Sequence, residues 1–247
     1  MSQPIRILLN GAKGRMGQAI LAVAASEQAT VAVAVDQGDN PAAHLDKVDV
    51  VIDFSFHSAT LPLAQLCAKQ GKPLVIGTTG HTADEKSAIT AAIKGIPVVW
   101  AGNYSVGVTL LNALVRQATR ALSDAGRWDI ELTEMHHRHK KDAPSGTAET
   151  LLKILLEERR LAEKDLKHGR SGLTGERPLG EIGVHALRGG DVVGEHTVLF
   201  SAEGERLELK HIATNREIFA RGAVRAARWL KGRSPGLYSM DDVLGLK

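Results

Sequence analysis

Basic, acidic and hydroxyl side chains are concentrated in residues 131–148, which read ELTEMHHRHKKDAPSGTA. Three of the ten histidines and two lysines lie within residues 136–141 of this segment. Ser145-Gly146-Thr147 opens a predicted helix, and backbone N–H groups at a helix start can hold a carboxylate. His136 and Lys140 are candidates for proton donation and anion binding. The segment therefore predicts a site for a small anion such as a dicarboxylate.

A metal site and a solvated basic loop are two other interpretations of the same segment. Only His136 and His139 have a spacing that could share a helical face, and no cysteine or carboxylate partner is obvious, so we expect no metal. A run of charges is most often solvated, but this one directly precedes a helix start suited to an anion. Nucleic acid is a poorer partner, because 31 basic residues face 28 acidic ones and aromatic residues make up only 4% of the chain.

A glycine-rich loop near the N-terminus predicts a dinucleotide site. It has the pattern G-x-x-G-x-x-G and consists of Gly11, Ala12, Lys13, Gly14, Arg15, Met16 and Gly17. Glycines at this spacing let the backbone approach a pyrophosphate, which the start of the following helix stabilises. Asp36 lies 19 residues after Gly17, at a distance typical of the acidic residue that binds ribose hydroxyls. The alternative is an ordinary glycine-rich turn between a strand and a helix.

Asp36 also bears on the choice of nicotinamide cofactor. A carboxylate there favours two free ribose hydroxyls over a 2′-phosphate, and Gln37 stands where an arginine could have bound that phosphate. Lys13 and Arg15 could compensate for the missing arginine. We therefore predict NADH as the preferred cofactor and leave NADPH open as a second one.

Three more loops follow predicted strands, and ligands of open parallel sheets bind at the carboxyl ends of the strands. These loops are Asp53-Phe54-Ser55, Gly77-Thr78-Thr79-Gly80 and Ala101-Gly102-Asn103-Tyr104-Ser105. Each is a candidate to line a cofactor crevice, although each alone is also compatible with a simple turn.

The elements that must position these loops alternate between strands and helices over the first hundred residues. Apolar, often β-branched runs predict strands at residues 5–9, 31–35, 48–54, 74–76 and 98–100. Helical patterns follow the glycine loop as far as Ala25 and recur at residues 58–69 and 82–93. This alternation indicates βαβ units and a parallel sheet.

The pattern changes after Trp100. Helices are predicted at residues 105–122, 145–158 and 216–230, an alternating strand at 129–135, and three strands within 176–213. Consecutive strands without helices between them indicate an antiparallel or mixed sheet. The expected fold class is α/β, with a Rossmann-like parallel-sheet dinucleotide domain and an α+β substrate domain that has a mixed open sheet.

The composition is that of a globular chain, with 247 residues, 43% of them hydrophobic and 24% charged. Cys67 is the single cysteine, which excludes an intrachain disulfide and fits a reducing compartment. The sequence shows neither a targeting segment nor an apolar run of the ~20 residues needed to span a bilayer. We expect a cytoplasmic protein without membrane contact.

The pattern E-x-x-E-x-H-x-x-x-K-x-D-x-P-S-G-T-A in residues 131–148 resembles the active-site motif of the dihydrodipicolinate reductase (4-hydroxy-tetrahydrodipicolinate reductase) family. Every fixed position of that motif is present. The resemblance extends over nearly the whole chain, through GAKGRMG, GTTG, NYSVGV, LRGGDVVGEHTV and the closing GLYSMDDVLGL. It implies hydride transfer from NAD(P)H to a cyclic imine dicarboxylate, in the synthesis of lysine and diaminopimelate.

The resemblance also implies a division of labour along the chain. Residues 1–104 and 214–247 would form the dinucleotide-binding domain. Residues 105–213 would form a substrate-binding and oligomerisation domain, whose mixed sheet builds a homotetramer.

Carried over by position, the resemblance assigns roles to individual residues. His136 matches the proton donor, Lys140 the essential lysine and His137 a substrate contact. Gly146 and Thr147 match positions that hold a substrate carboxylate. The matched cofactor positions are Gly11, Arg15, Met16, Asp36, Gly77, Thr79, Ala101, Gly102, Asn103 and Tyr104. Many members have a phenylalanine where Tyr104 stands, so its hydroxyl is unexplained.

The sequence leaves two assignments open. Arg188 lies in a matching segment but has no assigned role. The cations around His136 disfavour a protonated imidazole, so the proton donor is His136, Lys140 or a water.

Two other functions compete with the reductase. A semialdehyde dehydrogenase with a similar cofactor domain would need a cysteine nucleophile, and Cys67 lies in an apolar helix that favours a core position. A regulator that binds NADH without turnover would need neither the histidine-lysine segment nor the helix start beside it.

Overall fold

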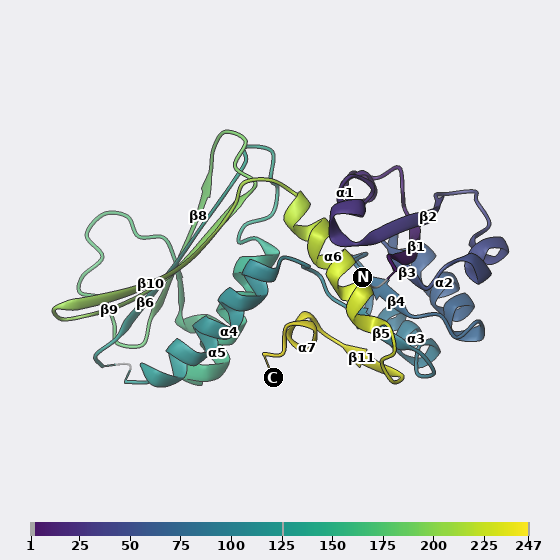
Figure 1. Ribbon diagram of the computed structural model, residues 1–247. Coiled ribbons are helices and arrows are strands. Elements are labelled where there is room, and N and C mark those ends of the chain that lie inside the picture. The colour runs from purple at the N-terminus through teal and green to yellow at the C-terminus, as the bar shows by residue number, and fades with distance from the viewer. Residues whose placement is uncertain (1–2, 125, 247) are drawn as a thin grey trace. The chain divides into compact units, whose positions relative to one another are not determined.

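The computed structural model describes residues 3–124 and 126–246. The chain forms two compact units, Met1–Val106 with Arg216–Lys247 and Gly107–Asn215. Each unit is built on a sheet of its own, with six strands in the first and five in the second (Figure 1). The expected α/β fold with one parallel and one mixed sheet is confirmed.

The sheet of the first unit is parallel throughout. Its strands lie in the order β11-β5-β4-β3-β1-β2. Their bounds are β1 Ile5–Asn10, β2 Ala29–Val35, β3 Val50–Asp53, β4 Leu74–Ile76, β5 Pro97–Trp100 and β11 Gly236–Tyr238. Apart from the exposed Arg6 of β1, the four central strands are largely buried, as expected for a sheet with helices on both faces.

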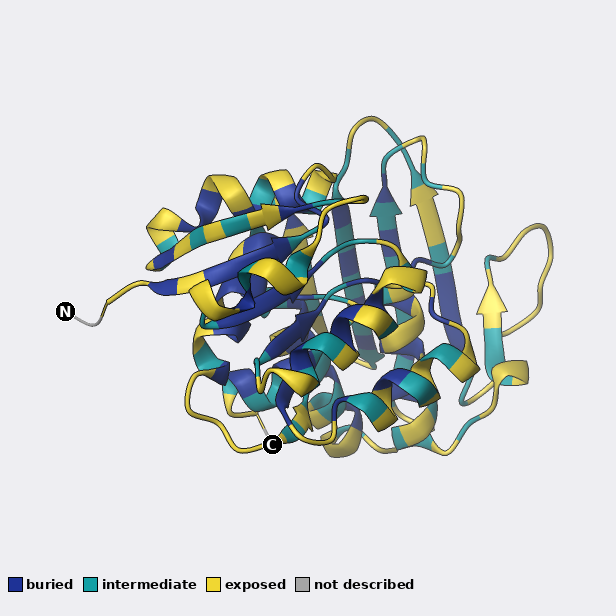
Figure 2. Ribbon diagram, turned by 90° about the vertical axis from the view of Figure 1, so that its right-hand side faces the viewer, coloured by how far each residue is buried: buried dark blue, intermediate teal, exposed yellow. Residues whose placement is uncertain are grey.

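Helices cover both faces of this sheet. They are α1 Arg15–Val23, α2 His57–Lys69, α3 Ala83–Ala92 and α6 Glu217–Leu230. Alternate side chains of β1 serve the two faces: Ile7 and Leu9 pack with α1 and α6, and Leu8 packs with α2 and α3. Each helix is therefore buried on one side and exposed on the other (Figure 2).

The second unit places two helices on one face of a mixed sheet. Its strands are β6 Asp129–His136, β7 Leu166–His168, β8 Ile182–Arg188, β9 Gly194–Ala202 and β10 Glu205–Ala213, in the order β10-β9-β6-β8-β7. β6 pairs antiparallel with β9 and parallel with β8. The helices α4 Val106–Ala121 and α5 Gly146–Arg159 pack through Val115 and Leu155 onto Leu132 and Phe200 of the sheet.

Several short elements were not expected from the sequence. They are β7, β11, α7 Met240–Leu244 and the 3-10 turns Ala25–Glu27, Pro41–Lys47 and Glu163–Asp165. Both missed strands have three residues and lie at sheet edges, so hydrophobic periodicity had too few positions to act on. Across the described ranges 3–124 and 126–246, no helix has the length and apolar character needed to cross a membrane.

Close packing of α6 in the first unit depends on Gly222. A Cβ at this position would lie 1.7 Å from the backbone oxygen of Tyr104. We expect Gly222→Ala to lower the free energy of unfolding by about 1–3 kcal/mol, although alanine favours a helix, because overpacking against a backbone atom cannot relax easily. Chemical denaturation would measure the change.

Gly95→Ala is the matched control, because a Cβ at Gly95 would meet no atom within 4 Å. Equal stability of the two variants would contradict this account of α6.

Candidate active site

The carboxyl ends of β1 and β3 meet where the strand order of the parallel sheet reverses, because β2 lies on one side of β1 and β3 on the other. Such a reversal is the usual ligand crevice of an open α/β sheet. Gly11 begins the loop after β1 with φ +84, and a Cβ there would lie 2.3 Å from the backbone oxygen of Phe54 in the loop after β3. The two loops therefore come this close because residue 11 is a glycine.

A buried carboxylate holds the loop after β3 in place. Asp53 has no exposed surface and accepts hydrogen bonds from Asn10 Nδ2 at 2.9 Å and Thr60 Oγ1 at 2.8 Å. Ser55 Oγ also donates to it. These bonds connect β1, α2 and the loop after β3, and so fix the backbone of that loop.

A pocket of about 640 Å³, the Asp36 pocket, lies beside the glycine loop. Gly11, Gly14 and Asp36 line it. Asp36 accepts backbone hydrogen bonds from Lys13 at 2.8 Å and Gln37 at 2.9 Å, which lower the pKa of its carboxyl below the usual value. An ionised carboxylate is therefore positioned as an acceptor for hydroxyl groups of a ligand.

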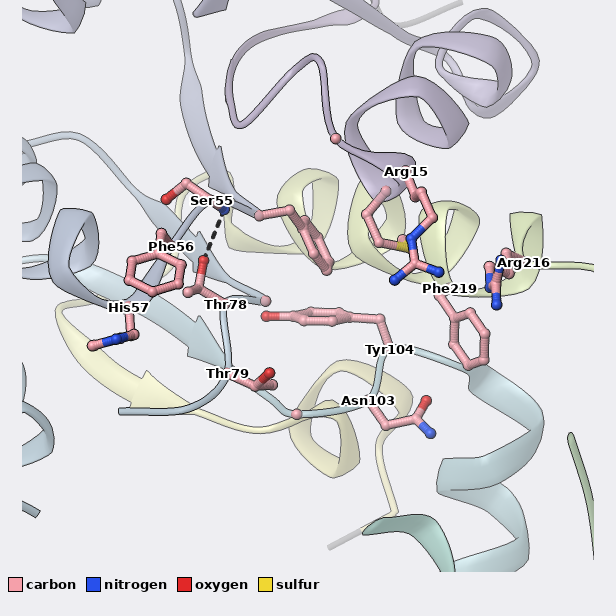
Figure 3. A pocket seen from close by; sticks show the side chains of 15 residues that line it. Arg15, Ser55, Phe56, His57, Thr78, Thr79, Asn103, Tyr104, Arg216 and Phe219 are labelled. Carbon is pink, nitrogen blue, oxygen red and sulfur yellow. Dashed lines mark hydrogen bonds between the residues drawn. The ribbon is translucent and has the colours of Figure 1, made fainter. Parts of the chain in front are cut away.

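A second pocket of about 540 Å³, the loop pocket, shares Gly14 and the residues after Asp53 with the first. Figure 3 shows Arg15, Asn103, Arg216 and Phe219 at one end of it. Ser55, Phe56, His57, Thr78 and Thr79 lie toward the other end, where Ser55 N donates to Thr78 Oγ1 at 3.0 Å. The loops after β3, β4 and β5 thus line one cavity, as their positions at strand ends predict.

Tyr104 has a structural explanation for its hydroxyl. The side chain is almost fully buried, and the hydroxyl donates to the backbone oxygen of Ile76 at 2.8 Å, with that of Val99 at 3.1 Å. Burial raises the pKa of Tyr104 well above its usual value. The ring therefore ties the loop after β5 to the ends of β4 and β5, while it also lines the loop pocket.

The structure brings most of the predicted cofactor residues to these two pockets, and some to neither. Those that line one or both are Gly11, Gly14, Arg15, Met16, Asp36, Gly77, Thr78, Thr79, Gly102, Asn103 and Tyr104. Ala12, Lys13 and Gly17 line neither, although the backbone N–H of Lys13 orients Asp36. Ala101 lines a third cavity of about 440 Å³, which shares Thr78, Thr79 and Gly102 with the loop pocket.

In the second unit, a fully buried carboxylate organises the histidine-lysine segment. Glu134 Oε2 accepts from His136 Nδ1 at 2.6 Å, and Arg188 donates to both carboxylate oxygens at 2.9 Å. Burial by itself would raise the pKa of Glu134, but the bonds from Arg188 and His136 lower it below the usual value. We call Glu134, His136, Ser145, Arg188 and His196 the Glu134 cluster.

The start of α5 belongs to the same cluster. Ser145 is the N-cap residue, its backbone N–H donates to Glu134 Oε1 at 3.1 Å, and its Oγ accepts from Ala148 N at 3.3 Å. The hydroxyl also contacts His196 Nε2 at 3.0 Å. Burial is the main cause that lowers the pKa of His196 to about 4, and the nearby His136 adds to it. His196 is therefore neutral near pH 7.

The loop between β6 and α5 carries the other predicted residues. Lys140 Nζ donates to Asp142 Oδ2 at 2.9 Å, and this bond lowers the pKa of Asp142. His137 is held through its backbone N–H, which donates to the oxygen of Val192 at 2.8 Å. Gly146 and Thr147 form the first residues of α5. Backbone bonds therefore join the segment to the loop after β8, while Arg138, His139 and Lys141 are exposed to solvent.

Two alternatives from the sequence concern a metal ion and a thiol nucleophile. In the described part of the chain, no group of three or more His, Cys, Asp or Glu residues could hold a metal ion. Cys67 is fully buried in α2, and burial raises the pKa of its thiol to about 12. A thiol in that state is inert as a nucleophile, which argues against the semialdehyde dehydrogenase.

Cys67 should react with a thiol reagent only after the chain is unfolded, because the buried thiol is protonated and inaccessible. Labelling followed by intact mass should show no adduct on the native protein and one adduct in denaturant. Rapid labelling of native protein at neutral pH would contradict the assignment of Cys67 to the core.

Sequence reasoning missed some residues of both sites. Arg216 and Phe219 line the loop pocket from the start of α6, more than a hundred residues after the other lining residues. Glu134 stood in the motif without a role, and His196 was not singled out. Glu134 and His196 each have a partner that is far away in the sequence, Arg188 and Ser145 respectively. A hint in the sequence was that Arg188 and His196 both fall in the segment LRGGDVVGEHTV.

Comparisons with known proteins cover the whole chain. Residues 5–104 match the family model described as dihydrodipicolinate reductase, N-terminus, and residues 107–244 match the C-terminus model of the same family. The 4-hydroxy-tetrahydrodipicolinate reductase of Akkermansia muciniphila is 55% identical over 244 residues, which is 98% of each chain. The enzyme of that name from Campylobacter concisus is 47% identical over 256 residues, covering 98% of this chain and 99% of the relative.

A solved structure supports the fold. A dihydrodipicolinate reductase from Paenisporosarcina sp. TG-14, with dipicolinate bound, superposes with a TM-score of 0.76 at 24% identity. The match covers 96% of this chain and 97% of that one.

Proposed function

Because the chain belongs to the dihydrodipicolinate reductase family, it is an NAD(P)H-dependent oxidoreductase that reduces 4-hydroxy-tetrahydrodipicolinate to tetrahydrodipicolinate, and we propose here which residues carry out this reaction. The reaction belongs to the synthesis of lysine and diaminopimelate. We assign cofactor binding to the Asp36 and loop pockets of the first unit, and substrate binding to the second unit, at the Glu134 cluster.

The first unit has the features that a dinucleotide requires. Gly11 leaves space that a Cβ would fill, and Asp36 offers an ionised carboxylate beside it. We assign the ribose to Asp36 and the nicotinamide end to the loop pocket, with Arg15, Thr79 and Asn103 among its contacts. A bound NADH or NADPH would supply the hydride.

The second unit has the features that a dicarboxylate requires. Backbone N–H groups of Gly146 and Thr147 at the start of α5 would hold one carboxylate, and His137 would contact the substrate. Hydride addition to a conjugated imine leaves negative charge, which His136 or Lys140 would stabilise and protonate. The observation that carries this proposal is the Glu134 cluster. His136 and Ser145, the N-cap residue of α5, both form hydrogen bonds with the buried carboxylate of Glu134.

We also propose that the protein is a homotetramer in the cytoplasm, and the support for both is the resemblance to the family.

The activity itself is tested by coupling the protein to a synthase that forms the cyclic imine from pyruvate and aspartate semialdehyde. Loss of nicotinamide absorbance that depends on the synthase is the expected result. Absence of synthase-dependent oxidation with either cofactor, in a protein shown to bind NADH, would contradict the proposed reaction.

NADH is the expected preferred cofactor in that assay, because the ionised Asp36 would accept hydrogen bonds from ribose hydroxyls and repel a 2′-phosphate. Asp36→Ala should lower the ratio of kcat/KM for NADH to that for NADPH by about tenfold or more, given ~1.5–3 kcal/mol for hydrogen bonds to a charged group. Asp46→Asn removes the same charge at an exposed position of the same unit and should leave the ratio unchanged. An unchanged ratio in Asp36→Ala would refute the assignment.

Lys140→Ala should lower kcat by about 10²-fold or more, the scale of general acid–base catalysis, while the Kd for NADH stays the same. Lys141→Ala is the matched control, because Lys141 is the adjacent, exposed lysine of the same loop. A near-normal kcat for Lys140→Ala would remove Lys140 from the mechanism.

A further inference from the structure

Glu134 uses both of its oxygens to join groups from three elements. Oε2 binds His136 Nδ1 on β6 and Arg188 on β8, whereas Oε1 binds Arg188 and the backbone N–H of Ser145 at the start of α5. The carboxylate is fully buried, and all four contacts lie between 2.6 and 3.1 Å.

These bonds determine which nitrogen of His136 carries a proton. An ionised carboxylate only accepts hydrogen bonds, so His136 Nδ1 must be the donor. The neutral ring is then protonated at Nδ1, and Nε2 is the atom that can take up or release a proton. Nε2 faces Gly194, where a Cβ would come within 3.0 Å of it, so the missing side chain leaves room at this nitrogen.

The same carboxylate fixes where that ring stands relative to α5. Ser145 caps α5, and its N–H shares the carboxylate with His136. Arg188 completes the arrangement, since it binds both oxygens of Glu134 and also donates to the backbone oxygen of Asp142 at 2.7 Å. Ring, helix start and loop therefore cannot shift independently.

We propose that Glu134 is a positioning residue for the reduction: it selects the Nδ1–H form of His136 and holds its Nε2 at a fixed place relative to the carboxylate-binding start of α5. This inference rests on the proposed function, because it assumes that His136 and α5 act on the same substrate. Arg188 supplies the charge that lets Glu134 stay ionised without solvent.

The titratable and charged groups around His136 enter any pH dependence. They are Glu134 on β6, Arg188 on β8, His196 on β9, and Lys140 and Asp142 in the loop before α5. The rings of His196 and His136 contact each other edge to face, with their centroids 5.2 Å apart. His196 is neutral near pH 7, so it adds no charge beside His136 there. Glu134 is the carboxylate in direct contact with the ring.

Steady-state kinetics of Glu134→Gln in the coupled assay test the proposal. We expect kcat to fall roughly 10- to 100-fold, with an unchanged Kd for NADH. This is the range seen when the hydrogen-bond partner of a metal-binding histidine is removed. The kcat–pH profile should also differ from that of the unaltered protein, because a neutral amide replaces the carboxylate in contact with the ring. Glu134→Asp retains the charge and should keep the pH profile while kcat falls, since a shorter side chain cannot make all four contacts.

Asp129→Asn is the matched control. Asp129 lies on the same strand but outside the motif of residues 131–148, and its carboxylate also accepts from an arginine, Arg177, at 2.8 Å. Its kcat and pH profile should match those of the unaltered protein. If Glu134→Gln folds and its kcat and pH profile equal those of Asp129→Asn, the proposal is overturned.

A spectroscopic measurement tests the proposal without any change at Glu134. In protein labelled with ¹⁵N-histidine, at a pH where the ring is neutral, His136 should show a protonated Nδ1 and a bare Nε2, with its signals assigned by their absence in His136→Gln. A protonated Nε2 with a bare Nδ1 would overturn the proposal. Failure of the unaltered protein to oxidise NADH or NADPH would instead contradict the proposed function, and the ring signals would still decide the state of His136.

Discussion

A carboxylate that is cut off from solvent must find a hydrogen-bond donor for each oxygen, and this requirement organises the second unit. Glu134 meets it with an arginine from β8, a histidine from its own strand and the backbone at the start of α5. Leaving such a charge unpaired is strongly destabilising, so the three partners are held together. The arrangement that satisfies Glu134 is also the one that presents His136 and the first turn of α5.

The first unit meets a comparable requirement with backbone geometry. Its parallel sheet brings the loops after β1 and β3 together at the reversal of strand order, and the absence of a side chain at Gly11 allows their backbones to touch. Asp53 then fixes the second loop through the neutral donors Asn10, Ser55 and Thr60, in contrast to the ion pair at Glu134. The first unit thus has cavities beside a loop that Asp53 holds in place. The second unit has a buried ion pair that determines which nitrogen of His136 carries a proton.

Much of this was predictable because the strands and helices have strong local patterns. Residues 74–76 were predicted as a strand and form β4, and the helix expected at residues 58–69 begins one residue earlier, at His57. The edge strands β7 and β11 were missed because three residues carry no periodicity. The partnership of Glu134 with Arg188 was out of reach for a different reason: the two residues are 54 positions apart, and strand register decides their contact. The sequence could not explain the hydroxyl of Tyr104, because its acceptors are the backbone oxygens of Ile76 in β4 and Val99 in β5.

The central claim is that α5 and His136 form one dicarboxylate site. The most direct measurement is an NMR titration of the full chain, saturated with NADH, with pyridine-2,6-dicarboxylate. The account predicts that the largest amide shifts fall on residues 145–147 and that the side-chain nitrogens of His136 shift with the same Kd. Saturable binding that leaves residues 145–147 and His136 unshifted would contradict it.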